Sequence, residues 1–191
     1  MNEIKTLKIF DLDETILRVP GFNSKKYVAQ AGYSFDHAYD FYDHPISLSD
    51  ELHTIQVISP VFEEWREGHE DPATLCALIT HRKKQLTDTV ISLLEARKMY
   101  FDKHFFLGRI YRKIDSTQEM LDRLPNIEEI CVFEDSIAQL AEYQKYFNKV
   151  NAKRKESGIK EYAIKLYIVD KSKMFRIQDF TISDERRIKL L

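Results

Sequence analysis

Two aspartates spaced two residues apart, Asp11 and Asp13, follow a short apolar run. If residues 7–12 form a β-strand, one carboxylate stands at the strand end and the other in the turn beyond it, so both face one mouth. Two close carboxylates repel each other, and a divalent cation or a proton between them relieves that repulsion. Asp11 could then attack an electrophile while Asp13 moves a proton. The alternative is that residues 11–14 form a solvated turn that caps a helix.

Other polar residues also follow apolar runs directly. Thr80 closes one continuous run, and Glu134 and Asp135 follow another. Continuous apolarity is typical of a central parallel strand with both faces covered. Ligands bind beyond the carboxyl ends of parallel strands, so we expect these side chains to lie at one edge of the sheet with Asp11.

The elements that must position these residues alternate between strands and helices. Strands are expected at residues 7–12, 74–80, 104–107, 127–133 and 162–169. Helices are expected at 59–69, at 83–98, from Ser116, and from Ile137 to Phe147, followed by a loop over 148–160. Ser59 before Pro60, and Ser116 with Glu119 three residues later, are typical of helix starts. This order predicts an α/β, Rossmann-like fold with a mostly parallel sheet and helices on both faces.

The composition is that of an ordinary globular domain. The chain has 191 residues, 43% apolar and 31% charged, with a formal charge of −2. We expect one domain over residues 1–191, in which 18–57 form a small flap rather than a large cap and 171–191 form a tail with no assigned structure. Cys76 and Cys131 lie in apolar runs, which predicts buried thiols in a reducing compartment. No apolar run reaches membrane length, so the expectation is a cytoplasmic protein without a membrane partner.

The residues expected at the sheet edge suit phosphoryl transfer. A carboxylate nucleophile forms an acyl phosphate, and a second group serves first as acid and then as base. Hydroxyl and cationic groups offset the charge of the phosphoryl oxygens, and Lys113, before the helix expected from Ser116, adds such a cation. Hard oxygen ligands favour Mg²⁺.

Several of these assignments have alternatives. Thr80 could satisfy a backbone group, Glu134 could cap a helix, and His81 could be a surface residue. The cation could come from another basic residue near Lys113, namely Lys103, Arg109 or Arg112.

The ordered set resembles the four motifs of the haloacid dehalogenase (HAD) superfamily. The motifs are residues 10–15 (Phe-Asp-Leu-Asp-Glu-Thr), 78–80 (Leu-Ile-Thr), Lys113 and 133–135 (Phe-Glu-Asp). The resemblance implies that Asp11 is the nucleophile and a Mg²⁺ ligand. It also implies that Asp13 is the general acid/base and a metal ligand through its carbonyl.

The same resemblance implies roles for the other residues of the set. Thr80 would bind the transferring phosphoryl group, Lys113 would neutralise it and orient the nucleophile, and Asp135 would hold the metal. Further contacts with the substrate are expected from Thr15, His81, Arg82 and Glu134.

A narrower resemblance is to the HAD domains of Swiss Army Knife RNA-repair-like proteins. It lies in residues 18–23, 41–48, 79–82 and 133–135. Where that family usually has two tryptophans, the chain has Phe41 and Tyr42. The threonine is followed by His81 rather than glycine, and Ser136 and Gln139 replace an arginine and a histidine.

Substrate choice stays open at this level. Residues 145–176 hold ten Lys or Arg and three acids, a charge that could guide a nucleic-acid backbone or belong to a solvated surface. The leading hypothesis is a Mg²⁺-dependent phosphatase of phosphorylated nucleic-acid ends. The alternatives are a phosphatase of small metabolites or nucleotides, and a non-catalytic module that binds RNA or protein.

Overall fold

A six-stranded sheet forms the centre of the molecule. The computed structural model describes residues 3–19, 35, 38–52 and 54–177. In spatial order the strands of the sheet are β5 (Lys103–Phe106), β4 (Thr74–Thr80), β1 (Thr6–Phe10), β6 (Glu129–Glu134), β7 (Ala163–Asp170) and β8 (Lys173–Ile177). All neighbours are parallel except β7 and β8, which are antiparallel. The predicted α/β, mostly parallel sheet is confirmed.

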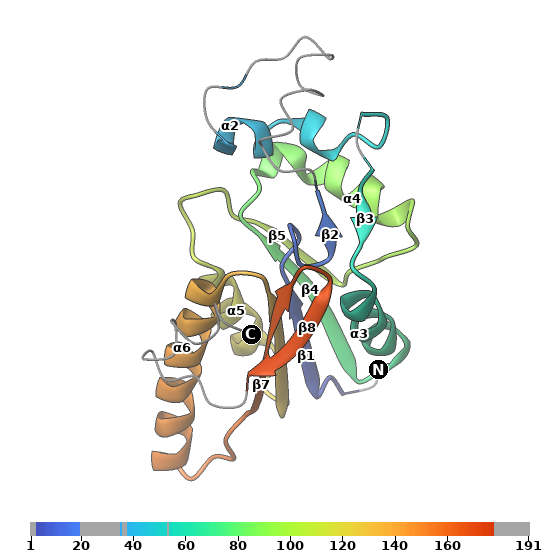
Figure 1. The fold of residues 1–191 in the computed structure, drawn as a ribbon. Coiled ribbons are helices and arrows are strands. Elements are labelled where there is room, and N and C mark those ends of the chain that lie inside the picture. Colours follow the sequence, from blue (N-terminus) through green and yellow to red (C-terminus); the bar gives the residue numbers. More distant parts are fainter. Residues whose placement is uncertain (1–2, 20–34, 36–37, 53, 178–191) are drawn as a thin grey trace.

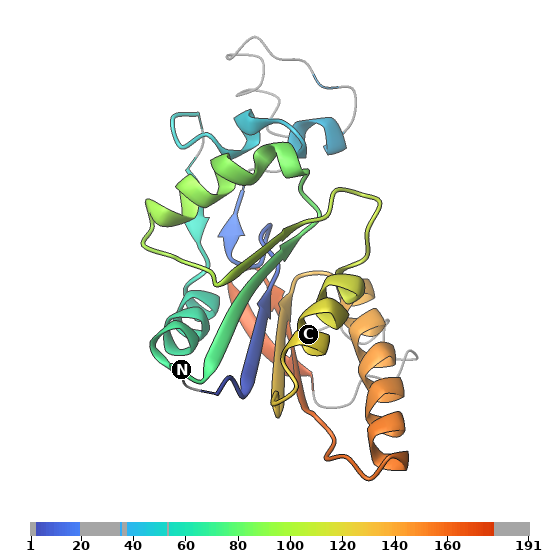
Figure 2. The ribbon, with the colours of Figure 1, turned by 180° about the vertical axis from the view of Figure 1, so that it is seen from behind.

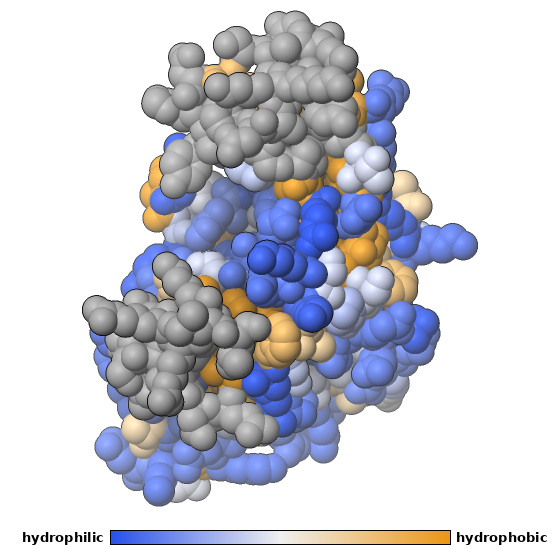
Figure 3. Space-filling view, in the orientation of Figure 1, coloured by the Kyte–Doolittle hydropathy of each residue, from blue (hydrophilic) through white to orange (hydrophobic). Residues whose placement is uncertain are grey.

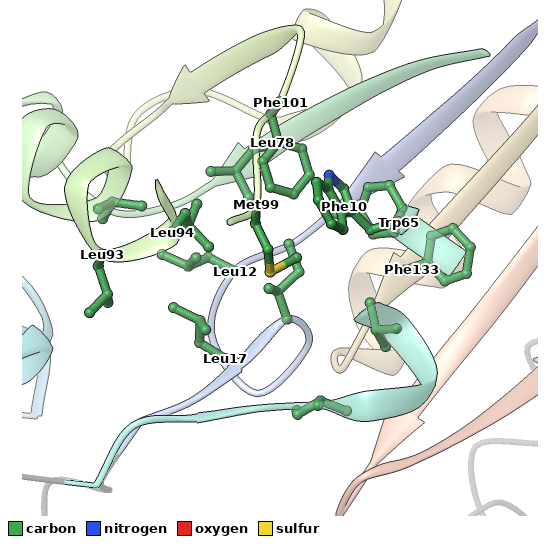
Figure 4. Packing of buried hydrophobic residues seen from close by; sticks show 14 of the residues in the cluster. Phe10, Leu12, Leu17, Trp65, Leu78, Leu93, Leu94, Met99, Phe101 and Phe133 are labelled. Atoms are coloured by element: carbon green, nitrogen blue, oxygen red, sulfur yellow. The ribbon is translucent and has the colours of Figure 1, made fainter. Parts of the chain in front are cut away.

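Helices cover both faces of this sheet (Figures 1 and 2). Alternate residues of β1 point to opposite faces, so Phe10 packs with Trp65 of α3 (Ser59–Glu70) in one buried cluster. Ile9 packs on the other face with residues of α5 (Lys113–Arg123) and α6 (Ile137–Glu156). Figure 4 shows the first cluster, in which Phe10 and Phe133 stack with centroids 4.6 Å apart. The two cores fix the strands, and with them the positions of the strand ends.

The N-cap predicted for one helix and the start predicted for another are wrong. The N-cap of α3 is Ile58, and Ser59 is already helical. α5 begins at Lys113 and not at Ser116, because Arg112 has the extended N-cap backbone and the chain is helical from the next residue. The shift makes Lys113 the first residue of the helix instead of a loop residue before it.

The loop expected over residues 148–160 is also wrong. α6 continues to Glu156, because residues 148–156 contain no Gly or Pro and Val150 still packs against the core. The helix ends at Ser157, and Gly158 follows with a φ of 69°, a left-handed conformation that glycine adopts without strain.

The described part of the flap, residues 18–57, lies beyond the carboxyl ends of the strands (Figure 1). It contains α2 (Ala38–Tyr42), the 3₁₀-helix η1 (Pro45–Leu48) and β3 (Gln56–Val57). β3 pairs antiparallel with β2 (Leu17–Arg18), and η1 packs against α4 (Thr87–Glu95), which follows the short 3₁₀-helix η2 (Lys84–Leu86). The remaining flap residues, 20–34, 36–37 and 53, lie outside the described residues.

Part of the predicted tail is a strand. Lys173–Ile177 forms β8 after a two-residue turn in which Lys171 and Ser172 both have positive φ. Positive φ at both positions is the type I′ turn that matches the twist of paired strands. Within the described residues, no helix has the length and apolarity needed to cross a membrane.

Candidate active site

A polar cavity of about 570 Å³ opens at the carboxyl ends of the central strands. Asp11 follows β1, Thr80 ends β4, and Glu134 ends β6. Figure 3 shows hydrophilic residues gathered between the flap and the sheet, on the side where these strands end. Eight residues expected from the sequence line the cavity, namely Asp11, Asp13, Thr80, His81, Arg82, Lys113, Glu134 and Asp135.

Lys113 joins two of these acids at the bottom of the cavity. Its Nζ lies 2.6 Å from Asp11 Oδ1 and 2.5 Å from Glu134 Oε2, and all three side chains are buried. The first turn of α5 places the ammonium there because Lys113 is the first helical residue. Burial by itself lowers the pKa of Lys113, but the charges of Asp11 and Glu134 raise it above its ordinary value. The lysine therefore stays charged between the two carboxylates.

Asp11 has an environment unlike that of an ordinary surface carboxylate. Burial raises its pKa to about 7, and the charge of Lys113 opposes that rise. Thr15 donates its hydroxyl to Asp11 Oδ2 at 3.3 Å. Thr15 is fully buried and is not among the described residues that line the cavity, so the structure places it behind the carboxylate and not at the expected substrate position.

Asp11, Glu134 and Asp135 form a group of acids suited to a cation. One carboxylate oxygen from each lies within 4.8 Å of the others. Burial, followed by the charge of Asp11, raises the pKa of Asp135 to about 9. Ser136 fixes the backbone beside them, since its amide donates to Glu134 Oε1 and its hydroxyl caps α6. Three hard oxygen donors with one lysine leave an excess of negative charge that a divalent cation would neutralise.

Asp13 is held by Arg82. Nε of Arg82 lies 2.9 Å from Asp13 Oδ2, and Nη2 lies 2.6 Å from Oδ1, a bidentate ion pair. Nη1 of the same guanidinium donates to the Tyr42 carbonyl at 2.5 Å and to Ser47 Oγ at 2.6 Å. Arg82 is 3% exposed, whereas the Asp13 side chain keeps 27% of its surface. Arg82, expected to contact the substrate, thus binds the acid/base candidate to the flap.

Thr80 is the last residue of β4, and His81 follows it. Thr80 is buried, and its hydroxyl accepts a bond from the Arg82 amide at 3.2 Å. The alternative in which Thr80 satisfies a backbone group is therefore confirmed, and the residue also lines the cavity. Burial, followed by the charge of Lys113, lowers the pKa of the His81 imidazole, which favours its neutral form.

The flap and the loop after β5 supply cavity residues that are not in the set of site residues expected from the sequence. Tyr42 and Asp43 come from the flap, and Asp43 pairs with Lys83 at 2.9 Å and with Arg109 at 2.7 Å. Arg109 appeared in the sequence only as a substitute for Lys113. The block 41–48 was a signal for the flap residues, but no local pattern connects it to Arg109.

Comparison with known proteins identifies the family. Residues 58–181, which are 124 of the 191, match the family described as HAD domain family 1 in Swiss Army Knife RNA repair proteins. The chain belongs to this HAD family. The match begins after Asp11 and Asp13, so those two residues are assigned by their position in the fold and not by the matched span.

Similarity beyond this HAD family is low. A chain in the "Structure of Pnkp1/Rnl/Hen1 complex" has 13% sequence identity and a TM-score of 0.45, covering 86% of this chain. The chain spans 47% of the length of that protein. A search of curated proteins found no match to this chain.

The basic stretch of this HAD domain, residues 145–176, lies mostly away from the cavity. α6 begins beside Asp135 and its 20 residues extend for about 30 Å, so its basic last turn is at the far end of the sheet (Figure 1). Two lysines of the basic stretch that follow α6 form ion pairs, Lys160 with Glu128 and Lys165 with Glu129, both at 2.6 Å.

Proposed function

We propose that this HAD domain hydrolyses phosphomonoesters by forming an acyl phosphate on Asp11. The observation that carries the proposal is the buried contact between Asp11 and Lys113, two residues that line the cavity. A buried, charged lysine is costly unless it faces opposite charge, and here it faces the carboxylate of Asp11, which also accepts a bond from the Thr15 hydroxyl behind it. The pair supplies both a nucleophile and a cation for the phosphoryl oxygens.

A magnesium ion fits the donor set next to this pair. Asp11, Glu134 and Asp135 provide carboxylate oxygens close to one another, and oxygen is the donor that Mg²⁺ prefers. When bound, the ion would offset the charge of the phosphoryl oxygens.

The first half of the reaction uses Asp11 and Asp13. A carboxylate oxygen of Asp11 bonds to phosphorus while the bond from phosphorus to the leaving oxygen breaks. Asp13, whose side chain is partly exposed and lines the cavity, acts in its protonated form and gives that proton to the leaving oxygen. Lys113 and the Thr80 hydroxyl bind the transferring group during this step.

The second half returns both residues to their starting state. Asp13, now a carboxylate, takes a proton from water as the water oxygen bonds to phosphorus. The bond from phosphorus to the Asp11 oxygen breaks, which releases inorganic phosphate. No other residue is needed to balance the protons.

The substrate class we propose is a phosphorylated end of a nucleic acid. Two observations support it: the family is described from RNA repair proteins, and only 64 residues separate Thr15 from Thr80, of which α3 and β4 take a part, so little chain remains for a flap. A small flap admits a bulky substrate. Small phosphorylated metabolites are the second candidate class. A binding module without turnover is the third, and the complete set of Asp11, Asp13 and Lys113 in the cavity argues against it.

The test is a phosphatase assay on wild-type protein and on Asp11→Asn, with Mg²⁺ present. Wild-type protein should release phosphate from oligonucleotides phosphorylated at the 5′ or 3′ end, and Asp11→Asn should lose about 1,000-fold or more of that activity. Asp88→Asn is the matched control, because Asp88 is exposed on α4 and lies outside the cavity. Full activity in Asp11→Asn would overturn the assignment of the nucleophile.

A further inference from the structure

The loop between β5 and α5 carries two unusually exposed apolar side chains beside the cavity. Ile110 is 85% exposed and Tyr111 is 63% exposed. Arginines flank them in the sequence Arg109-Ile110-Tyr111-Arg112. We call residues 108–112 the rim loop. Figures 1 and 2 show that the segment between β5 and α5 extends away from the sheet on the flap side.

The rim loop is held against the active-site wall at its base. The Leu107 amide donates to the Thr80 carbonyl at 2.9 Å, and the Gly108 amide donates to the Arg82 carbonyl at 3.1 Å. Gly108 has a φ of 61°, so the turn that projects the loop requires a residue tolerant of left-handed backbone. The loop position is therefore fixed by the same segment that supplies Thr80 and Arg82.

Arg109 connects the rim loop to both the cavity and the flap. It lines the cavity and bonds to Asp43 of the flap at 2.7 Å. Tyr111 is two residues further along, at most about 7 Å by chain length. A group attached to a phosphate in the cavity could therefore reach the loop.

The positive charges of the rim loop favour binding of an anionic, single-stranded nucleic acid. Arg112 pairs with Asp115, and both side chains are more than half exposed. Exposed ion pairs of this kind contribute little to stability, so the guanidinium can exchange its partner for a phosphate at small cost. A flat aromatic ring between two arginines is the combination by which proteins bind single-stranded nucleic acid, with bases stacked on the ring and phosphates on the cations.

We infer that the rim loop binds the nucleotides next to the phosphorylated end of a single-stranded nucleic acid, with Tyr111 as a stacking platform and Arg109 and Arg112 as phosphate contacts. The inference rests on the proposed phosphatase function for the reaction, but not for the binding. It assigns the recognition of single-stranded nucleic acid to the rim loop and not to the basic end of α6, which lies at the far end of the sheet.

Turnover gives the first test. The ratio of kcat/KM for a phosphorylated pentanucleotide to kcat/KM for p-nitrophenyl phosphate should fall about 10-fold or more in Tyr111→Ala. Tyr100→Ala is the matched control, because Tyr100 is also an exposed tyrosine, at 49%, outside the cavity. An unchanged ratio in Tyr111→Ala would overturn the inference.

Binding gives a second test that needs no catalysis. Fluorescence anisotropy of a labelled, phosphorylated pentanucleotide should show weaker binding to Tyr111→Ala than to wild-type protein. Arg112→Ala should reduce the slope of log K against log salt by about 0.7, the value for one phosphate contact on a single strand. Lys153→Ala, at the far end of α6, should leave the slope unchanged.

The two proposals fail in different ways. Wild-type protein that binds the pentanucleotide through Tyr111 but releases no phosphate from any substrate would contradict the proposed function and support the inference. Active protein without affinity for the pentanucleotide would contradict the inference alone. A dimer in solution that dissociates in Tyr111→Ala, without nucleic-acid binding, would show that the loop joins copies of this chain and would overturn it as well.

Discussion

Arg82 and Asp13 form a bidentate ion pair whose guanidinium also bonds to the flap. The two residues are 69 positions apart, and the further bonds run to the Tyr42 carbonyl and Ser47 Oγ. One buried arginine thus connects the turn after β1, the end of β4 and the flap. The position of the proposed acid/base group and the position of the flap are linked through this side chain.

Arg82→Ala should lower both stability and turnover. Removing the guanidinium leaves Asp13 and two flap acceptors without their donor, which should cost about 2–4 kcal/mol in the free energy of unfolding. Asp13 then loses its orientation, and kcat should fall about 100-fold. Urea unfolding and phosphatase kinetics measure the two effects.

Ser47→Ala separates the two roles of Arg82, because it removes one flap contact and leaves the pair with Asp13 intact. It should lower stability by about 1 kcal/mol and change kcat much less than Arg82→Ala. Equal losses of kcat in both variants would show that the flap contact, and not the ion pair, positions Asp13.

Lys113→Met should destabilise the metal-free domain strongly. Asp11 and Glu134 would face each other without a cation in a buried site, at a cost of about 3–5 kcal/mol. The double variant Lys113→Met/Glu134→Gln should recover about 1–3 kcal/mol of that loss, because one of the two buried charges is gone. Unfolding curves of the four proteins in the cycle, recorded with a chelator, measure the coupling. Additive effects would contradict a direct interaction.

Gly68→Ala tests how closely α3 packs on the sheet. A Cβ at Gly68 would lie 2.8 Å from Cys76 Sγ and 3.0 Å from Lys8 Cδ. Alanine gains about 1 kcal/mol of helix propensity, but the contact with the buried sulfur should outweigh it, for a net loss of about 1–2 kcal/mol. In a Cys76→Ala background, where the sulfur is absent, the same substitution should cost less. A stabilised Gly68→Ala would show that α3 shifts freely against β4.

The sheet and the strand-end residues were predictable because each depends on local sequence. Continuous apolar runs mark buried parallel strands, and Asp11, Thr80 and Glu134 stand where those runs end. Parallel topology then requires the strand ends to meet at one edge. The two cores follow from the same runs, because alternate residues face opposite sides.

The missed features depend on contacts between distant segments. No local pattern reveals that Arg82 bonds to residues 35 and 40 positions earlier in the flap. The β7–β8 turn also lacked its usual signal, because Lys171 and Ser172 occupy positions where glycine or asparagine is the common choice. The capping-box pattern at Ser116 was misleading because Arg112, four residues earlier, already supplies the extended N-cap backbone.

The stabilising effect of Mg²⁺ should increase with pH. Burial raises the pKa of Asp11 to about 7 and that of Asp135 to about 9, both above the ordinary value of 3.8. A carboxyl whose pKa is higher in the folded state than in the unfolded state favours folding when it is protonated. The two groups therefore reduce the stability of the metal-free domain as pH rises from 3.8 to about 7 for Asp11 and to about 9 for Asp135. Mg²⁺ binds the deprotonated carboxylates and must displace their protons at low pH.

The increase in Tm on adding Mg²⁺ should therefore be small at about pH 6 and several degrees at about pH 9, where both groups release their protons. Differential scanning calorimetry with MgCl₂ and with a chelator measures the increase at each pH. Asp135→Asn removes the carboxylate with the higher pKa, so its Tm should respond to Mg²⁺ less and with a weaker dependence on pH. A wild-type increase that is the same at both pH values would show that protons do not compete with the cation at this site.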